Sequence, residues 1–221
     1  MYTTNNKLIL LIALISISNI SYAEKAPFES SYEPLPYTNT IFRNANIYDG
    51  EGNEFSETDL LIKDGKIISI GSDLPSSPEF IEVDASGKWI TPGIIDIHSH
   101  MGVYSAPSVS TSSDGNESTS PVTADVWAEH SIWTQDPQFA LALKGGVTTF
   151  HVLPGSANLI GGRGVTAKNV QRNTINSMKF PNAPHTLKMA CGENPKRVYG
   201  NRKQAPSTRM GNIAGYRKAW I

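Results

Sequence analysis

The sequence predicts an α/β protein in which a small β-sheet domain precedes buried strands that form a parallel sheet. Three observations support this fold class. Short strand patterns separated by turn residues fill residues 40–90, later apolar strands cover 91–100, 147–153 and 187–191, and helical or long irregular stretches separate those later strands. Buried strands joined in this way are typical of parallel sheets. The 221 residues suffice for one full domain or two small ones.

The N-terminus has the pattern of a secretion signal. Lys7 precedes an apolar run from Leu8 to Ile17, and Ser21 and Ala23 occupy the small-residue positions of a signal-peptidase site. The run is shorter than the roughly 20 apolar residues of a membrane span, which disfavours a stable membrane anchor. We therefore expect residues 1–23 to be a signal peptide, cleaved after Ala23, and the mature protein to be periplasmic or secreted.

Cysteine and charge content narrow the function classes. Cys191 is the only cysteine, so no disulfide can form within one chain. Its apolar neighbours predict a buried, unreactive thiol. The formal net charge is −1, and no basic segment interleaved with aromatic residues suggests a nucleic-acid partner.

Residues 24–90 predict a linker and then a small sheet. Residues 24–39 are polar and proline-rich, as linkers are. The strands expected after them are 41–48, 60–63, 66–70, 80–83 and 88–90. Asp64-Gly65 is the two-residue pair that a type I′ hairpin prefers. We expect residues 40–90 to form an antiparallel sheet that leads directly into the next strand.

The stretch from Thr91 to His100 predicts a strand that ends in a metal-binding pair. A Pro-Gly turn precedes a short apolar run that ends in His-Ser-His. Alternate residues of a strand share one face, which places the Cα atoms of His98 and His100 about 6.6 Å apart. Two imidazoles at that spacing can bind one zinc ion. The alternative is that the two histidines have no ligand, as in many isolated His-x-His pairs.

The chain after His100 is irregular and then helical. Ser105 to Ser120 is a serine-rich stretch that predicts a long loop, either a functional lid or disordered. Residues 123–133 predict a helix in which His130 is a packing or surface histidine. Asp136 and Pro137 predict the start of a second helix, which Gly145-Gly146 ends.

The remaining segments predict two more buried strands and a basic tail. Residues 147–153 form one strand, in which His151 could face a site near the strand's end. The glycine-rich stretch 156–164 does not have the spacing of a phosphate-binding loop and predicts a tight loop. Residues 187–191 form the other strand, and the chain beyond it is basic and loop-like until 213–221, which predict a helix.

Three strand ends carry residues of functional interest. His98 and His100 end the first buried strand, Pro154-Gly155 ends the second, and Glu193 follows the third. In parallel α/β folds, functional residues gather at the carboxyl ends of strands. The sequence therefore predicts one site at this edge of the sheet.

Three motifs occur in an order that resembles the start of an amidohydrolase-superfamily enzyme. They are Ile-Lys-Asp-Gly-Lys-Ile-Ile-Ser-Ile-Gly, Pro-Gly-Ile-Ile-Asp-Ile-His-Ser-His and Gly-Gly-Val-Thr-Thr. Leu-Pro-Gly-Ser-Ala-Asn-Leu-Ile-Gly-Gly is similar to the exported, imidazolonepropionase-like branch. The resemblance covers residues 40–221. It implies a small β-sandwich domain, of which residues 40–90 form part, and a (β/α)8 barrel that starts at residue 91.

The resemblance also implies a ligand set. His98 and His100 match the two metal-binding histidines of the first barrel strand, and Asp96 would support them from deeper on the same face. The family often adds a bridging ligand, a carboxylated lysine or a glutamate. Lys188 and Glu193 are the candidates, and Glu193 is preferred because it follows the strand's end, whereas Lys188 would lie inside the strand.

The chain departs from the family pattern after its third barrel strand. The family's later histidines and its final catalytic aspartate have no counterpart here, and a full barrel takes about 250 residues. We therefore expect an N-terminal fragment with an incomplete barrel, which alone would bind metal weakly and would not turn over substrate.

For the intact protein, the resemblance implies a hydrolase of carbon–nitrogen bonds in amides or cyclic amides. A divalent metal, expected to be zinc, would activate the attacking water. The partner is a small-molecule substrate, and a homo-oligomer is left open. The alternative is a non-catalytic exported module, or the product of a decayed gene, that would bind a partner through the serine-rich loop and the basic tail.

Overall fold

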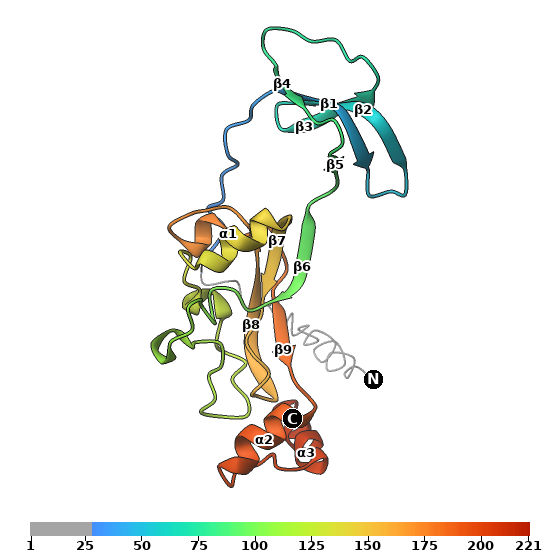
Figure 1. Ribbon diagram of the computed structural model, residues 1–221. Coiled ribbons are helices and arrows are strands. Elements are labelled where there is room, and N and C mark those ends of the chain that lie inside the picture. Colours follow the sequence, from blue (N-terminus) through green and yellow to red (C-terminus); the bar gives the residue numbers. More distant parts are fainter. Residues whose placement is uncertain (1–27) are drawn as a thin grey trace, which may run out of the picture.

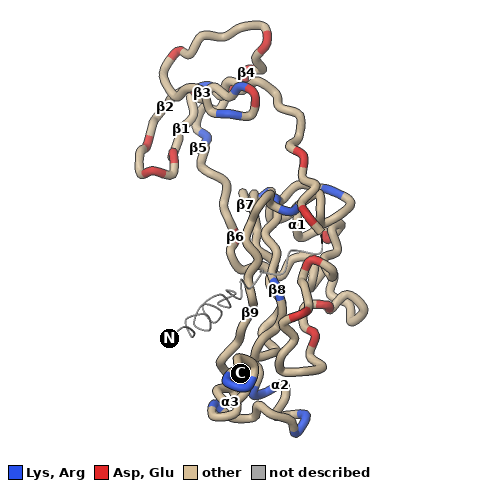
Figure 2. The backbone as a smooth tube through the Cα atoms, turned by 180° about the vertical axis from the view of Figure 1, so that it is seen from behind, with Lys and Arg blue, Asp and Glu red and all other residues tan. Residues whose placement is uncertain are grey.

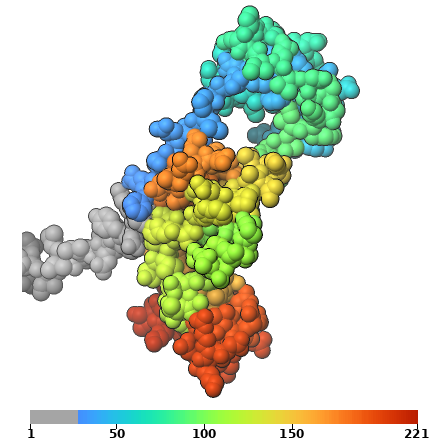
Figure 3. All heavy atoms as spheres, turned by 60° about the vertical axis from the view of Figure 1, so that its left-hand side comes forward, coloured from blue at the N-terminus to red at the C-terminus, as the bar shows by residue number. Residues whose placement is uncertain are grey.

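The computed structural model describes residues 28–221, which form two β-sheets followed by a pair of helices (Figure 1). The predicted signal peptide and the first residues of the predicted linker lie outside the described residues. Residues 28–39 contain no regular element and lead into the first sheet. Figure 3 shows this sheet as a separate body, joined to the rest of the chain by two narrow connections.

The first sheet is mixed and not wholly antiparallel as predicted. Its strands are β1 (Thr40–Tyr48), β2 (Glu54–Lys63), β3 (Lys66–Gly71), β4 (Ile81–Asp84) and β5 (Trp89–Ile90). The strands β1, β2 and β3 are antiparallel neighbours, but β4 and β5 pair in parallel with β1. The reason is the connection 72–80, which carries the chain from β3 at one edge to the opposite side of β1.

The predicted hairpin at Asp64-Gly65 is confirmed. Both residues have positive φ angles, 51° and 73°, as a type I′ turn requires. One face of the sheet buries Ala45, Ile47 and Leu60. Among residues 28–221, these strands form one layer and no second sheet faces them, so the described chain does not supply the other half of a sandwich.

The second sheet contains the strand with the histidine pair. Its order is β6 (Ile94–Ser99), β7 (Val147–Val152), β8 (Ile160–Lys168) and β9 (Thr186–Met189). Strands β6 and β7 are parallel, while β8 is antiparallel to both of its neighbours. The strands β6, β7 and β9 therefore run in one direction, as predicted, with a reversed strand between the second and the third.

The reversed strand corrects the prediction of a loop at 156–164. Residues 160–164 belong to β8, although three of them are glycines. These glycines suit close approach to neighbouring groups: a Cβ on Gly164 would lie 2.7 Å from His151 Nε2, and Gly162 has a φ of 112°. Glycine content therefore marks close packing here, not a turn.

The prediction of a helix over residues 123–133 is wrong. The segment contains only the 3₁₀ turn Ala128–Ser131. Its backbone pairs with β8, because Thr123 N donates to Ile160 O at 2.9 Å and Arg163 N donates to Val126 O at 2.8 Å. Tertiary pairing satisfies these polar groups better than a short isolated helix would.

The helix α1 (Pro137–Lys144) follows the prediction. The Asp136 side chain accepts from Gln138 N at 3.0 Å, Pro137 takes the first helical position, and Gly145 follows the last turn. α1 covers the outer face of β7, where Phe139 stacks on Phe150 with ring centroids 5.1 Å apart (Figure 1). The serine-rich stretch 105–120 is a loop with one 3₁₀ turn, Ser110–Ser112, and another 3₁₀ turn, Ile175–Ser177, lies between β8 and β9.

The C-terminal part contains one helix that was predicted and one that was not. α3 (Arg209–Ala219) overlaps the prediction of 213–221, while α2 (Glu193–Asn201) replaces a predicted loop. The predictions of a buried third strand and a buried Cys191 are wrong: β9 is partly exposed, and Cys191 is exposed because it lies in the turn that leads to α2.

α3 holds the turn between β9 and α2. Asn212, which is 1% exposed, donates from Nδ2 to the carbonyls of Cys191 at 3.0 Å and Gly192 at 3.1 Å. The Tyr216 hydroxyl donates to the carbonyl of Ala190. The whole turn is therefore fixed from one side by a single helix. Among residues 28–221, no helix is long and apolar enough to span a membrane.

Lys179 forms a buried ion pair with Glu129 and also holds the segment before β1 through hydrogen bonds. Lys179 Nζ lies 2.8 Å from Glu129 Oε2, and these side chains are 5% and 1% exposed. Lys179 Nζ also donates to Phe28 O at 2.7 Å, and Ser30 Oγ donates to Lys179 O at 2.8 Å. The contact with Glu129 lacks hydrogen-bond geometry, so the charge of Lys179 is what compensates the buried carboxylate.

We predict that Lys179→Met destabilises the chain by about 3–5 kcal/mol, because it removes the lysine charge 2.8 Å from the buried Glu129 carboxylate and leaves only His130, whose Nε2 is 3.6 Å from Glu129 Oε1. Urea unfolding measures this loss. Lys63→Met is the matched control: it breaks the exposed Lys63–Glu79 pair, which is worth at most about 1 kcal/mol. Equal losses in the two variants would contradict the role given to Lys179.

Candidate functional site

The turn before β6 is shaped to present the histidine pair. A Cβ on Gly93 would overlap the side chain of Thr148, so only glycine lets β6 lie this close to β7. Asp96 and His98 lie in β6, and His100 directly follows Ser99, the last residue of that strand. The rings of His98 and His100 meet edge to face with their centroids 5.2 Å apart.

His100 is held in one tautomer. Its Nδ1 lies 2.8 Å from the carbonyl of Leu153, and since a carbonyl only accepts, Nδ1 carries the proton. The neutral ring therefore keeps the lone pair on Nε2, the nitrogen that is free to bind a metal. Leu153 is positioned in turn by its own N–H, which donates to Ser99 O at 3.0 Å.

Asp96 orients the backbone at the pair. Its Oδ1 accepts from the backbone N–H of His98 at 3.0 Å. Its negative charge also raises the pKa of His98, the smallest of the influences on that ring. The predicted role of Asp96 as a support for metal-binding histidines stays a prediction.

Lys188, and not Glu193, lies against the histidine pair. Lys188 Nζ is 3.1 Å from His98 Nε2. Glu193 is the first residue of α2, where it is exposed and pairs with Arg197 at 3.0 Å. Glu193 would reach the pair only if the site lay beyond the strand's end. The sheet instead curls, so that β9 at one edge faces β6 at the other and a residue within β9 reaches the pair.

Burial and charge lower the pKa values of this cluster. Burial lowers the pKa of Lys188, which favours the neutral amine. The charge of Lys188 is the largest influence that lowers the pKa of His98, followed by burial and by His100. A neutral His98 can accept a hydrogen bond from the lysine nitrogen, so the two shifts fit the contact.

His151 lies beside this cluster on the inner face of the sheet. Its Nδ1 is 2.8 Å from Thr166 Oγ1, and its Nε2 is 2.7 Å from Thr186 Oγ1. Burial, and next the charge of His98, lower its pKa. The sequence identified His151 as a residue that could face a site, but it gave no signal for the two threonines, because their approach depends on the reversed strand β8.

His130 does not belong to this cluster. Its side chain is half exposed and meets Phe28 edge to face, with ring centroids 6.2 Å apart. The prediction of a packing or surface histidine is confirmed.

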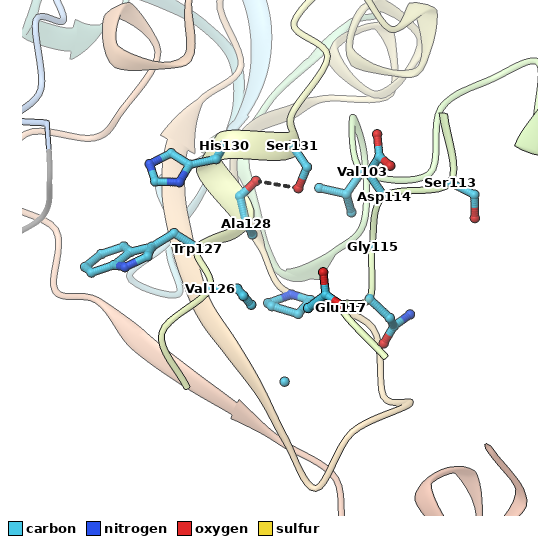
Figure 4. Close-up of a pocket in the computed structure, with 13 residues that line it drawn as sticks. Val103, Ser113, Asp114, Gly115, Glu117, Val126, Trp127, Ala128, His130 and Ser131 are labelled. Carbon is cyan, nitrogen blue, oxygen red and sulfur yellow. Dashed lines mark hydrogen bonds between the residues drawn. The ribbon is translucent and has the colours of Figure 1, made fainter. Parts of the chain in front are cut away.

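Two cavities lie near the site. One, of about 300 Å³, is lined by His100 and by residues of α2 and of the loops at 104–116 and 155–157. The other, of about 390 Å³, lies between the loop 113–117 and the turn 126–131, where Figure 4 shows Asp114, Glu117 and Trp127 around it. Only the first contains a member of the histidine pair.

The donor set fits part of a metal site. Two imidazoles and a lysine with a lowered pKa suit zinc better than magnesium or calcium, which prefer oxygen ligands. Within residues 28–221, however, no group of three or more His, Cys, Asp or Glu side chains could hold a metal. The described chain therefore brings two imidazoles and one lysine nitrogen together.

We predict that Lys188→Met raises the pKa of His98 in the metal-free chain, because it removes the largest lowering influence. NMR titration of the His98 ring measures the shift, and Lys63→Met, on the other sheet, should leave it unchanged. An unshifted His98 in Lys188→Met would argue against the contact.

The same shift predicts a pH dependence of stability. The folded chain binds a proton at His98 less tightly than the unfolded chain, whose pKa is near 6.5. Acidification through that value should therefore lower the free energy of unfolding, and Lys188→Met should reduce the loss.

The known proteins that are similar to this chain include an amidohydrolase and an allantoinase. No family model matches the chain. Amidohydrolase tasK of Hapsidospora irregularis is 34% identical over 207 residues, which cover 82% of this chain and 21% of that protein. An allantoinase of Bacillus licheniformis is 34% identical over 115 residues, covering 52% of this chain and 20% of the relative.

A solved structure has the same fold. The amidohydrolase from Thermotoga maritima superposes with a TM-score of 0.74 and 41% identity, over 82% of this chain and 46% of that one. The chain thus spans about a fifth of the length of the curated relatives named above and about half of the solved structure. The names of these relatives and the shared half-barrel fold support a place for this chain in the amidohydrolase superfamily.

Proposed function

We propose that the whole protein is a metal-dependent hydrolase of carbon–nitrogen bonds in amides or cyclic amides. The observation that carries the proposal is the convergence of His98, His100 and Lys188, with Lys188 Nζ 3.1 Å from His98 Nε2. The relatives named above and an L-hydantoinase of Paenarthrobacter aurescens, 34% identical over 61 residues (28% of this chain and 13% of that protein), support this class of reaction.

In this proposal His98 and His100 hold a divalent metal, expected to be zinc. When bound, the metal would polarise the scissile carbonyl and lower the pKa of a water molecule toward about 7. His100 contributes Nε2, because its Nδ1 is committed to Leu153. Asp96 supports the pair through the backbone of His98.

Lys188 is the stronger candidate for the additional ligand. A neutral lysine amine can add to carbon dioxide: the nitrogen lone pair forms the new N–C bond and one proton is released, which leaves a carbamate. Burial lowers the pKa of Lys188 and so increases the fraction of neutral amine. The carbamate would supply an oxygen ligand to the metal, whereas the protonated amine has no lone pair with which to bind it.

A non-catalytic exported binding module is the competing function. The observation that favours it is that residues 28–221 contain no complete cluster of metal-binding side chains. As part of the hydrolase proposal, we also propose that the protein belongs to an imidazolonepropionase-like branch of the superfamily. The two functions differ in whether the histidine pair binds metal.

We predict that His98→Ala lowers zinc affinity by more than about 100-fold, since even groups that only support metal ligands contribute 10–100-fold. Competition with a chromophoric chelator measures the affinity, and hydrolysis of a cyclic amide should fall with it in the whole protein. His130→Ala is the matched control and should change neither. Unchanged zinc affinity in His98→Ala would rule out the metal role.

The same measurement separates the two ligand candidates. Lys188→Met should weaken zinc binding and abolish the carbamate NMR signal obtained with ¹³C-labelled bicarbonate. Glu193→Gln should retain both. The reverse result would restore Glu193 as the ligand.

We also propose that the protein is exported through residues 1–23. The support is the sequence pattern of Lys7, the apolar run and Ala23. Expression with the native N-terminus should give a mature protein that begins at Glu24, as read by N-terminal sequencing. Ala23→Leu should block cleavage, because the signal peptidase requires a small residue there, and a mature protein that still begins at Met1 would refute the proposal.

A further inference from the structure

The cavity of about 300 Å³ beside His100 has polar side chains in its lining that the proposed metal chemistry does not use. Its polar lining consists of His100, Tyr104, Asn116, Ser156, Asn194 and Arg197. Arg197 is the permanent charge of this lining, which includes no Asp or Glu. The few polar groups that line a pocket near a reaction site select the substrate group that complements them.

We propose that this cavity binds a carboxylate group of the substrate and that Arg197 is its charged partner. The inference rests on the proposed function, because it assigns the substrate class as amides or cyclic amides that also carry a carboxylate. One guanidinium balances one negative charge, and its planar fork matches the two oxygens of a carboxylate.

One wall of the cavity is fixed by two glycines. A Cβ on Gly155 would overlap both the Asn116 amide and the Tyr104 hydroxyl, and one on Gly115 would overlap the Tyr104 ring. Asn116 Nδ2 donates to the Tyr104 hydroxyl, which therefore keeps its own proton for a further partner. The glycines let these two polar groups approach the backbone and face the cavity together.

The other wall comes from α2 and the loop after β7. Asn194 Nδ2 donates to Ser156 Oγ at 2.6 Å, so the Ser156 hydroxyl retains a proton that it can donate. Arg197 donates from Nε to Glu193 Oε1 at 3.0 Å and from Nη2 to Asn194 Oδ1 at 3.4 Å. Its Nη1 has no partner within residues 28–221. Exposed pairs such as Arg197–Glu193 are weak, so a carboxylate can compete with Glu193.

The surrounding charge favours an anionic ligand. Residues 193–221 contain seven basic residues and one acidic residue, and Figure 2 shows basic positions on α2, on α3 and in the connection between them. The basic residues are Lys196, Arg197, Arg202, Lys203, Arg209, Arg217 and Lys218. Such a field attracts negatively charged ligands. The neighbouring cavity in Figure 4 differs, because Asp114 and Glu117 are in its lining.

The test measures binding without turnover. The probes are N-acetylglycine, which carries an amide and a carboxylate, and N-acetylglycinamide, its neutral counterpart, each titrated into the metal-free chain by NMR. We expect N-acetylglycine to bind roughly 10- to 100-fold more tightly, the range for a hydrogen-bonded charge pair. Arg197→Ala should abolish the difference, Arg197→Lys should restore part of it, and Glu193→Gln should increase it.

The control is Lys196→Ala, which removes the same charge from the same helix outside the cavity lining and should retain the preference for N-acetylglycine. Equal binding of the two probes, or a preference that survives Arg197→Ala, would overturn the proposal. Inorganic phosphate that binds as tightly as N-acetylglycine would identify a general anion site and would also overturn it. Because no metal is present, loss of the hydrolase proposal would not affect this outcome.

Discussion

The curl of the second sheet is the constraint on which the candidate site depends. β6 and β9 are the two edges of a four-stranded sheet, yet Lys188 and His98 are in contact across its inner face. A flat sheet would separate these edges by three strand spacings of about 4.8 Å each. Sheets twist because of backbone sterics, and here the twist closes enough of an arc to bring the two edges together. The cluster is therefore a product of tertiary structure and not of any local motif.

The reversed strand β8 makes that curl compatible with a filled interior. Gly164 leaves space for the His151 ring, and Thr166 on the same strand contacts that ring. On the opposite face, Val165 and Ala167 join the core that packs under α1. One strand thus serves two environments, with small and polar residues inside and apolar residues outside. This division follows from the alternation of side chains along a strand.

Local sequence patterns predicted the elements whose stabilising interactions are local. The Asp64-Gly65 hairpin and the Asp136 cap of α1 depend on residues close in sequence. The predictions that were wrong concern segments whose stabilising interactions are with residues distant in sequence. The segment 123–133 is not an α-helix because β8 offers its backbone hydrogen bonds. The contact of Lys188 with His98 depends on the distant strand β6. Non-local pairing leaves no periodic signal in either segment.

The role of α3 has a consequence for how a ligand would be recognised. Lys188 and Arg197 lie on the two sides of the turn at Ala190–Gly192, and α3 fixes that turn through Asn212 and Tyr216. On the proposed function, the separation between the reacting amide and the carboxylate of the substrate is then set by a helix whose own side chains do not line the cavity. Substrates of different length could be accommodated by changes in α3 that leave every ligand-binding residue in place. Specificity could evolve there without altering the chemistry.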